Sequence, residues 1–116
     1  MTKIVNKTKN IILAEKTEIA DTPLKRMKGL LGKNNLNQGE GLIIKPCSSI
    51  HTFFMRFSID VVFLDDYNEV TALTESLPPF RFFGSFLKGK IVLELPQGTI
   101  ARTKTSINDK IEIQVD

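Results

Sequence analysis

Residues 59–76, IDVVFLDDYNEVTALTES, decide the fold. Two runs rich in β-branched and aromatic residues lie on either side of Asp65-Asp66-Tyr67-Asn68. Asp and Asn favour tight turns, while Val, Ile and Phe favour strands. The stretch therefore predicts an antiparallel β-hairpin with its turn at residues 65–68.

Further β-like segments precede and follow this hairpin. They lie at residues 3–6, 10–20, 41–46, 49–55, 90–95 and 110–115. Their mostly short connections favour antiparallel pairing. Pro96 opens a stretch, residues 96–106, that can form a short helix. We expect an α+β fold that is mainly β, a small antiparallel curled sheet or barrel with one or two short helices.

One of these helices is predicted at residues 21–32, DTPLKRMKGLLG. Asp21 or Thr22 can cap its start, and Gly32 suits the position after its end. Gly29 then falls inside the helix, where either close packing against a strand or room for a ligand would explain it, and we prefer close packing. The apolar residues repeat at helical spacing and predict a face that packs on the core: Leu24, Met27, Leu30 and Leu31.

The composition bounds the class of protein. The 116 residues, with 41% hydrophobic and 25% charged residues, predict a single domain, residues 1–116. One Cys excludes an internal disulfide. We find no run long enough for a signal peptide or a membrane span, so we expect a cytoplasmic monomer without a cofactor.

Charge is distributed unevenly along the chain. Residues 1–57 carry ten Lys or Arg and four acids, whereas the whole chain has a net charge of +3. The basic residues are spread over several predicted elements rather than clustered. Nucleic acid is therefore not the partner we expect, and a small molecule or a protein is preferred.

Four stretches together resemble a known family. They are RMKGLLG (26–32), SIHTFFMRFSIDVVFLDDYNEV (49–70), ESLPPF (75–80) and VLELPQGTIARTKTSINDKIEI (92–113). The pattern resembles domain of unknown function 192, a family of small β-rich bacterial and archaeal proteins, over about residues 20–115. The resemblance implies a β-rich fold but no activity, because the family has no established biochemical function.

Two positions depart from the family pattern. Ser58 stands where members often have Pro, which affects only local rigidity. Asn108 stands where they have Gly before Asp. Asn tolerates a positive φ, so the turn before the last strand can be kept.

Cys47, His51 and Met55 recur at a spacing of four residues. On an extended strand this spacing separates Cys47 from His51 by about 13 Å, too far to share one metal ion. The same distance argues against a Cys-His nucleophilic pair. We therefore predict no metal site, and a structural role for Cys47.

His51 and Asp60 form the most plausible reactive pair. If the chain reverses around Phe57 and Ser58, the flanking strands pair and these two side chains approach each other. The strand around His51 is apolar on both faces, which predicts a central position. His51 could then act as a general base oriented by Asp60, or the two could form a structural hydrogen bond.

Residues 77–88 predict an exposed loop rich in Phe. Its aromatic side chains either plug the mouth of the barrel or form a patch for a ligand or partner. Arg56 could present donors to a carboxylate or phosphate. The candidate ligand-binding residues are Arg56, Phe80, Arg81, Phe82, Phe83 and Phe86.

Three functions remain open at this point. The first is a non-catalytic binding module with its cleft between the His51/Asp60 region and the Phe80–Phe86 loop. The second is a small metal-independent enzyme, of hydrolase type, with His51 as base and Asp60 as its orienter. The third is contact with RNA or a membrane surface through the basic N-terminal half.

Overall fold

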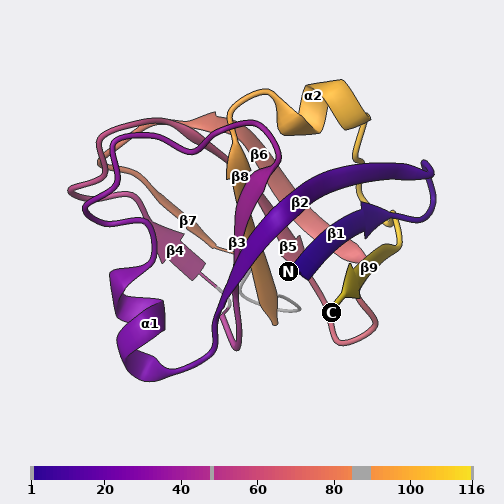
Figure 1. The fold of residues 1–116 in the computed structure, drawn as a ribbon, viewed down its shortest axis with the longest axis horizontal. Helices are drawn as coiled ribbons and strands as arrows, with labels where there is room; N and C mark the ends of the chain where they lie inside the picture. Colours follow the sequence, from indigo (N-terminus) through magenta and orange to yellow (C-terminus); the bar gives the residue numbers. More distant parts are fainter. Residues whose placement is uncertain (1, 48, 85–89, 116) are drawn as a thin grey trace.

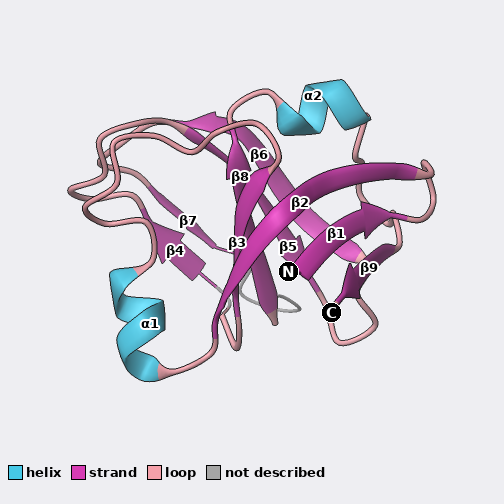
Figure 2. Cartoon of the chain, viewed as in Figure 1, coloured by secondary structure: helices cyan, strands magenta, loops and turns pink. Residues whose placement is uncertain are grey.

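A computed structural model gives the structure of residues 2–47, 49–84 and 90–115. It is mainly β with two short helices (Figures 1 and 2). The elements in chain order are β1 (Thr2–Asn6), β2 (Ile11–Ala20), α1 (Pro23–Lys28), β3 (Glu40–Ile44), β4 (Ser49–His51), β5 (Ile59–Leu64), β6 (Val70–Leu77), β7 (Phe82–Gly84), β8 (Ile91–Pro96), α2 (Thr99–Thr103) and β9 (Ile111–Gln114). The predicted fold class is confirmed.

The β5–β6 hairpin forms as the sequence predicts. The Asp65 carboxylate accepts hydrogen bonds from the main-chain N–H of Tyr67 (2.9 Å) and of Glu69 (3.0 Å). Asn68 adopts a positive φ of 61° that suits the turn. All six residues of β5 are buried, because β5 lies between β6 and β8 and is covered on both faces.

The main sheet has seven strands in the order β6-β5-β8-β3-β2-β1-β9. Most neighbours are antiparallel, but β2 and β3 are parallel, from Lys16 opposite Glu40 to Ala20 opposite Ile44. The expectation of purely antiparallel pairing is therefore wrong at this position. The connection through α1 is long enough to return the chain to the end of the sheet where β2 began.

The sheet curls until its two edge strands, β6 and β9, meet at one end. An isolated bridge joins Glu69 to Lys110, and the Val70 N–H donates to the Asp109 carbonyl (2.9 Å). The curl separates two hydrophobic cores, one on each face. The first core comprises Ile4, Leu13, Ala14, Ile43, Val62, Leu64, Val70, Leu93, Leu95, Ile100 and Ile111. The second comprises Ala20, Leu30, Leu42, Ile44, Ile50, Met55, Ile59, Val61, Phe63, Leu77 and Val92.

Helix α1 begins as predicted but ends early. The Thr22 hydroxyl accepts a hydrogen bond from the Lys25 N–H (3.2 Å) and caps the helix. Gly29 has a φ of 49° and ends the helix, so it is a C-terminal cap and not a packing contact inside the helix. No helix among the described residues is long and apolar enough to cross a membrane.

The early end of α1 changes which of its apolar residues are buried. Leu24 and Met27 are 77% and 76% exposed, whereas Leu30, beyond the helix, is buried. The predicted apolar helix face is therefore wrong for its first two members. They remain on the surface because the chain leaves helical geometry before Leu30 reaches the core.

Strand β4 is short and marginal, not central as predicted. It pairs with β7 in a separate two-stranded sheet, with His51 opposite Phe82. The chain turns at Phe53 and Phe54, where Phe54 has a φ of 68°. This turn ends the strand after His51, so the predicted pairing of the His51 strand with the Asp60 strand does not form.

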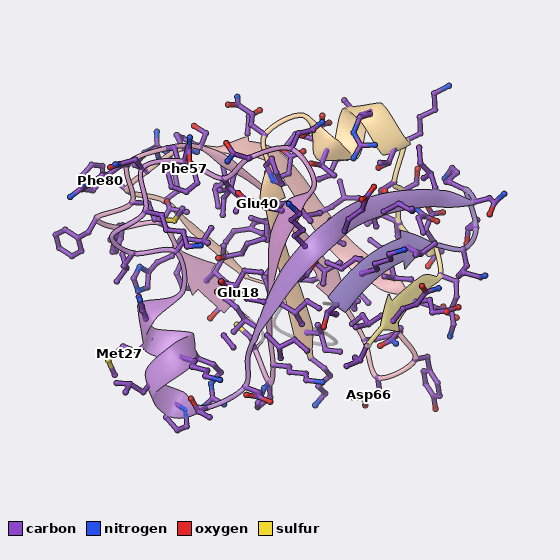
Figure 3. The ribbon with its side chains drawn as sticks, in the orientation of Figure 1. Glu18, Met27, Glu40, Phe57, Asp66 and Phe80 are labelled. Atoms are coloured by element: carbon purple, nitrogen blue, oxygen red, sulfur yellow. The ribbon has the colours of Figure 1, made fainter. Side chains whose placement is uncertain are left out.

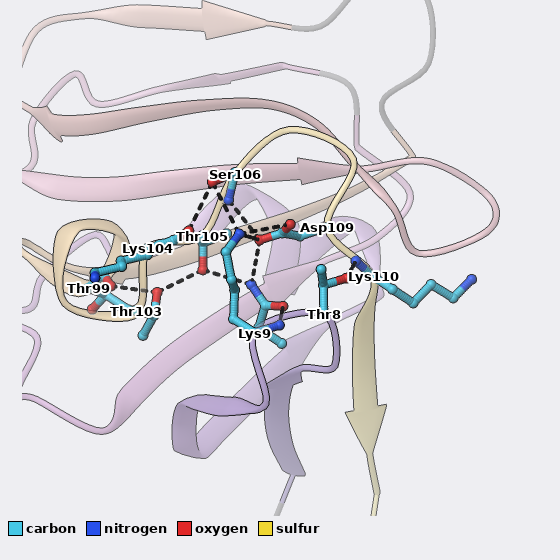
Figure 4. Close-up of polar contacts among 10 residues, drawn as sticks. Thr8, Lys9, Thr99, Thr103, Lys104, Thr105, Ser106, Asp109 and Lys110 are labelled. Carbon is cyan, nitrogen blue, oxygen red and sulfur yellow. Dashed lines mark hydrogen bonds and ion pairs between the residues drawn. The ribbon is translucent and has the colours of Figure 1, made fainter.

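A polar network ties the β1–β2 turn to the segment between α2 and β9 (Figure 4). The Asp109 carboxylate accepts hydrogen bonds from the Asn6 amide (2.9 Å), the Lys9 ammonium (2.9 Å) and the Ser106 N–H (2.9 Å). Burial by itself raises the pKa of Asp109, but these hydrogen-bond donors outweigh burial, and the pKa is lowered.

Asn108, the residue before Asp109, has a φ of 74°, which confirms the expected turn.

We expect Asp109→Asn to remove stability at neutral pH and to flatten the acid side of the stability profile. The lowered native pKa means that the folded protein gains stability from this carboxylate above the unfolded pKa and loses it as the pH falls through the native pKa. Urea unfolding of both proteins between about pH 7 and pH 3 measures the difference. If the difference in unfolding free energy between the two proteins stayed constant across this pH range, the lowered pKa of Asp109 would be contradicted.

Candidate functional site

A cavity of about 440 Å³ lies between the α1 region and the outer face of the sheet. Its wall is mostly apolar and includes members of the second core, and its volume is in the range of small-molecule sites. The lining residues are Pro23, Arg26, Met27, Lys28, Gly29, Leu30, Leu31, Ile44, Pro46, Cys47, Ser49, Ile50, His51, Met55 and Glu94. We call it the Glu94 cavity.

Glu94 is the one acid in the lining of this cavity. It lies in the middle of β8, opposite Leu42 of β3 and Val61 of β5. Its side chain shares a face with Val92 of the second core, because strand residues alternate between faces. The carboxyl group therefore lies among apolar side chains, and Glu94 is only 3% exposed.

One oxygen of this carboxyl group is left without a partner. Glu94 Oε1 is buried and makes no hydrogen bond within the described residues. Thr17 Oγ1 is in the same condition, but Thr17 does not line the cavity. Buried polar atoms are nearly always hydrogen-bonded, so this unpaired carboxyl oxygen distinguishes Glu94 from the other residues that line the cavity.

Burial raises the pKa of Glu94 to about 7. The cause is the removal of the carboxyl group from water, which disfavours its charged form. The group therefore exchanges its proton close to neutral pH. A carboxyl with such a pKa can accept a hydrogen bond as an anion or donate one as an acid.

Cys47 lines the same cavity and is half-buried. Its Sγ donates a hydrogen bond to the Ser49 carbonyl oxygen (3.0 Å). Burial raises the pKa of the Cys47 thiol, and the charge of Glu94 adds to this effect. Thiols react as thiolates, so the raised pKa disfavours Cys47 as a nucleophile.

The more exposed part of the cavity lining is basic, and we call this part the mouth of the cavity. Arg26 and Lys28 line it from α1, and His51 lines it from β4. Arg26 is half-buried, while Lys28 and His51 are exposed. The lining thus combines a buried carboxyl with more exposed Arg and Lys side chains, which constrains the ligand that it can bind.

His51 and Asp60 lie in different environments, His51 at the surface and Asp60 in the interior. Asp60 is fully buried, and its two oxygens accept from the Ser76 N–H (2.9 Å) and the Ile100 N–H (2.8 Å). His51 is exposed and stacks on Phe53 with ring centroids 5.2 Å apart. No hydrogen bond joins His51 to Asp60 within the described residues, and Asp60 instead binds the start of α2 to β5.

The Phe-rich loop divides between core and surface. Phe83 packs on Phe63 of the second core, with ring centroids 5.3 Å apart. Phe80 and Phe82 are 64% and 58% exposed. The loop is thus both a plug, through Phe83, and a patch. Phe86 lies outside the described residues.

The two candidate arginines lie beside this patch. Arg56 donates to the Asn34 side-chain oxygen (2.6 Å), and Arg81 donates to the Phe80 carbonyl oxygen (3.4 Å). Both side chains are exposed and neither lines the Glu94 cavity. They border the aromatic surface and not the cavity.

Cys47, His51 and Met55 all line the Glu94 cavity. The strand ends at His51 and the chain turns at Phe54, so Met55 reaches the cavity after a turn and not along one strand. Among the described residues no cluster of three or more His, Cys, Asp or Glu is positioned to hold a metal ion.

A second cavity, of about 750 Å³, opens beside the first half of β2, residues 37–40 and Arg102. Its charged lining residues, Glu15, Lys16, Glu40 and Arg102, are exposed or half-buried. They are solvated, and none is left with an unsatisfied buried atom in the described part of the chain. Among the described residues this cavity therefore has no buried, unpaired carboxyl group like that of Glu94.

Sequence reasoning missed Glu94, although a signal was present. In KIVLELP the residue occupies a position between Leu93 and Leu95 of a predicted strand. An acid is rarely fully buried without a partner. An unexplained carboxyl in a buried strand is therefore itself a pointer to a site.

Comparison with known proteins places the chain in a family. The family model DUF192, described as Uncharacterized ACR, matches residues 4–113. A UPF0127 protein from Thermococcus sibiricus is 37% identical over 97% of this chain and 75% of its own length. One from Pyrococcus abyssi is 37% identical over 94% of this chain and 95% of its own. A crystal structure of a protein of unknown function from Novosphingobium aromaticivorans shares the fold, with a TM-score of 0.82 at 21% identity over 96% of this chain and 82% of that one. The chain belongs to the DUF192 family.

Proposed function

We propose that this protein is a binding module whose Glu94 cavity holds a small, largely apolar ligand. Glu94 accepts a hydrogen bond from a polar group at the inner end of the ligand. Arg26 and Lys28 at the mouth pair with an acidic group at its outer end. The ligand class is thus an apolar chain or ring with a hydroxyl or similar donor at one end and a carboxylate or phosphate at the other.

The unpaired, buried Oε1 of Glu94 is the observation that carries this proposal. Leaving a buried acceptor unsatisfied costs about 1 to 3 kcal/mol, more when the group is charged. A ligand donor would recover this free energy at the moment of binding. The apolar wall, with Leu30, Ile50 and Met55, would add hydrophobic burial of the ligand body.

The basic mouth supports the orientation of the ligand. A cationic ligand would have to pass Arg26 and Lys28 and would be repelled there. An anionic end is attracted to these side chains, and Arg26 can form paired hydrogen bonds to a carboxylate or phosphate. His51 also lies at this mouth.

The proposal is tested with ω-hydroxy carboxylic acids of about six to ten carbon atoms, which suit the size of the cavity. We expect each to bind about tenfold more tightly than the acid of equal length without the hydroxyl, because one hydrogen bond to a carboxyl group is gained. Isothermal titration calorimetry measures both affinities. In Glu94→Leu we expect the preference for the hydroxylated acid to vanish.

Glu75→Leu is the matched control, since Glu75 is an exposed acid of β6 that does not line the cavity. It should keep the preference for the hydroxylated acid. The proposal fails if neither acid series binds the native protein, or if Glu94→Leu discriminates between the two series as the native protein does.

A catalytic role for the same carboxyl is the second candidate, and the pKa of Glu94 near 7 favours it. General acids and bases work best with pKa values close to the operating pH. In this version Glu94, and not His51 with Asp60, moves the proton. Product analysis after long incubation of the native protein with the bound acids separates the two candidates, since a binding module returns them unchanged.

A further inference from the structure

A second functional surface surrounds the mouth of the Glu94 cavity. Ten large apolar side chains are strongly exposed among the described residues, and six of them come from three segments. The six are Leu24, Met27, Phe53, Phe54, Phe80 and Phe82. We call the surface that they form, in segments 23–34, 45–57 and 78–84, the aromatic face.

Direct contacts and a shared cavity join these three segments. The Phe53 ring stacks on His51, which lies opposite Phe82 in the β4–β7 pair. The Phe80 N–H donates to the Thr52 carbonyl oxygen (3.1 Å). Met27 and His51 line the same cavity from opposite elements. Figure 3 shows Met27 and Phe80 on the left margin of the molecule and Asp66 away from them, at its lower right.

The charge of these segments is entirely basic. They contain seven Lys or Arg and no Asp or Glu: Lys25, Arg26, Lys28, Lys33, Lys45, Arg56 and Arg81. Asp21, Asp60 and Glu75 are the nearest acids along the chain and lie just outside the segments. The rest of the chain is net negative, because the whole carries only +3. The aromatic face is thus apolar at its projecting points and positive around them.

Two of the aromatic side chains are presented at a conformational cost. Phe54 and Phe80 have φ values of 68° and 64°, in the left-handed region that bulky residues rarely adopt. Phe54 is 77% exposed, so burial of its ring does not explain the strain. Backbone strain of this kind is concentrated at functional sites, where it holds a side chain in a required direction.

We propose that the aromatic face binds the surface of an anionic phospholipid bilayer. Exposed Phe, Leu and Met side chains enter the boundary between head groups and acyl chains, while Lys and Arg side chains contact the anionic head groups. Leu24 and Met27 favour lipid over single-stranded RNA, because aliphatic side chains provide no platform for base stacking. This inference does not depend on which ligand occupies the Glu94 cavity.

Vesicle co-sedimentation tests the proposal with the full chain. We expect binding to phosphatidylcholine vesicles that contain about one third phosphatidylglycerol, and weak or no binding to pure phosphatidylcholine vesicles. Added salt should weaken binding, since head-group attraction is screened. The proposal is overturned if the protein does not bind the anionic vesicles at low salt, if it binds both kinds equally, or if it binds an RNA oligonucleotide in preference to them.

A double variant, Phe54→Asn with Phe80→Asn, separates a binding role from a structural one. Asn tolerates a positive φ, so the melting temperature should rise by a few degrees while vesicle affinity falls at least about tenfold. Tyr67→Ser is the control, because Tyr67 is 74% exposed and lies in the turn between β5 and β6, outside the three segments. It should bind vesicles as the native protein does. Unchanged vesicle binding by the double variant, or a lowered melting temperature, would overturn the assignment of these rings to lipid.

Discussion

Replacing Glu94 with Gln should make the protein more stable than the native chain by about 3 kcal/mol near pH 9, and the gain should shrink toward pH 5. The native pKa of about 7 lies above the ordinary value of 4.5. Between these values the folded state holds a proton that the unfolded state has released, so the stability of the native chain falls as the pH rises. Above pH 7 the folded protein bears the full cost of a buried charge.

Urea unfolding of both proteins across this pH range measures the effect. Glu75→Gln is the control, because Glu75 is exposed and its replacement should leave the pH profile of the native chain in place. If the difference in unfolding free energy between Glu94→Gln and the native chain does not vary with pH, Glu94 has an ordinary pKa. The Glu94 cavity would then lack the raised carboxyl pKa that sets it apart.

Asp60→Ala should destabilise the protein by about 3 kcal/mol. The substitution leaves the N–H groups of Ser76 and Ile100 without their acceptor. Asp60 fixes the end of β6, where Ser76 has a φ of 53°, and the first turn of α2, whose cap Gly98 supplies no side chain. The side chain is fully buried, so water cannot replace the lost bonds without opening the fold.

The measurement is again the free energy of unfolding in urea. Asp66→Ala provides the comparison, because Asp66 is an exposed turn residue and its loss should cost less than about 0.5 kcal/mol. A loss below about 1 kcal/mol for Asp60→Ala would return Asp60 to the set of candidate functional residues. In that case the pairing of Asp60 with His51 would need to be reconsidered.

Local rules predicted much of the fold. The turn at residues 65–68, the cap at Thr22 and the positive φ of Asn108 follow from the preferences of Asp, Thr and Asn, and the structure confirms all three. These features depend on contacts within a few residues. Sequence reasoning failed where tertiary contacts decide the outcome. The parallel pairing of β2 with β3 depends on how far the α1 connection carries the chain.

The region of the candidate site could be predicted from the sequence, but not its central residue. The stretch around His51 was identified because it holds rare residue types, and His51 does line the cavity. Its expected partner, Asp60, failed to meet it because Phe54 turns the chain with a φ of 68°, a conformation that nothing in the residue type suggests. Glu94 was missed because its environment is made by Leu42 and Val61 from distant strands.

The cavity and the aromatic face share the residues at the cavity mouth. Met27 belongs to both, and His51 lines the cavity and stacks on Phe53 of the face, so a ligand that enters the cavity passes beside side chains proposed to contact lipid. The two proposals still make separate predictions. Glu94→Leu should abolish the preference for hydroxylated acids and leave vesicle binding intact. Phe54→Asn with Phe80→Asn should weaken vesicle binding and leave the preference for hydroxylated acids intact.

The central claim is that the Glu94 carboxyl is buried, unpaired and available to a ligand. A carbon-13 NMR titration of the Glu94 side-chain carboxyl tests it most directly, with and without a saturating ω-hydroxy acid. We predict a pKa of about 7 in the free protein and a lower value in the complex, because a hydrogen bond from the ligand favours the charged form. A pKa close to 4.5 in the free protein, or the same value with and without the ligand, would contradict the account.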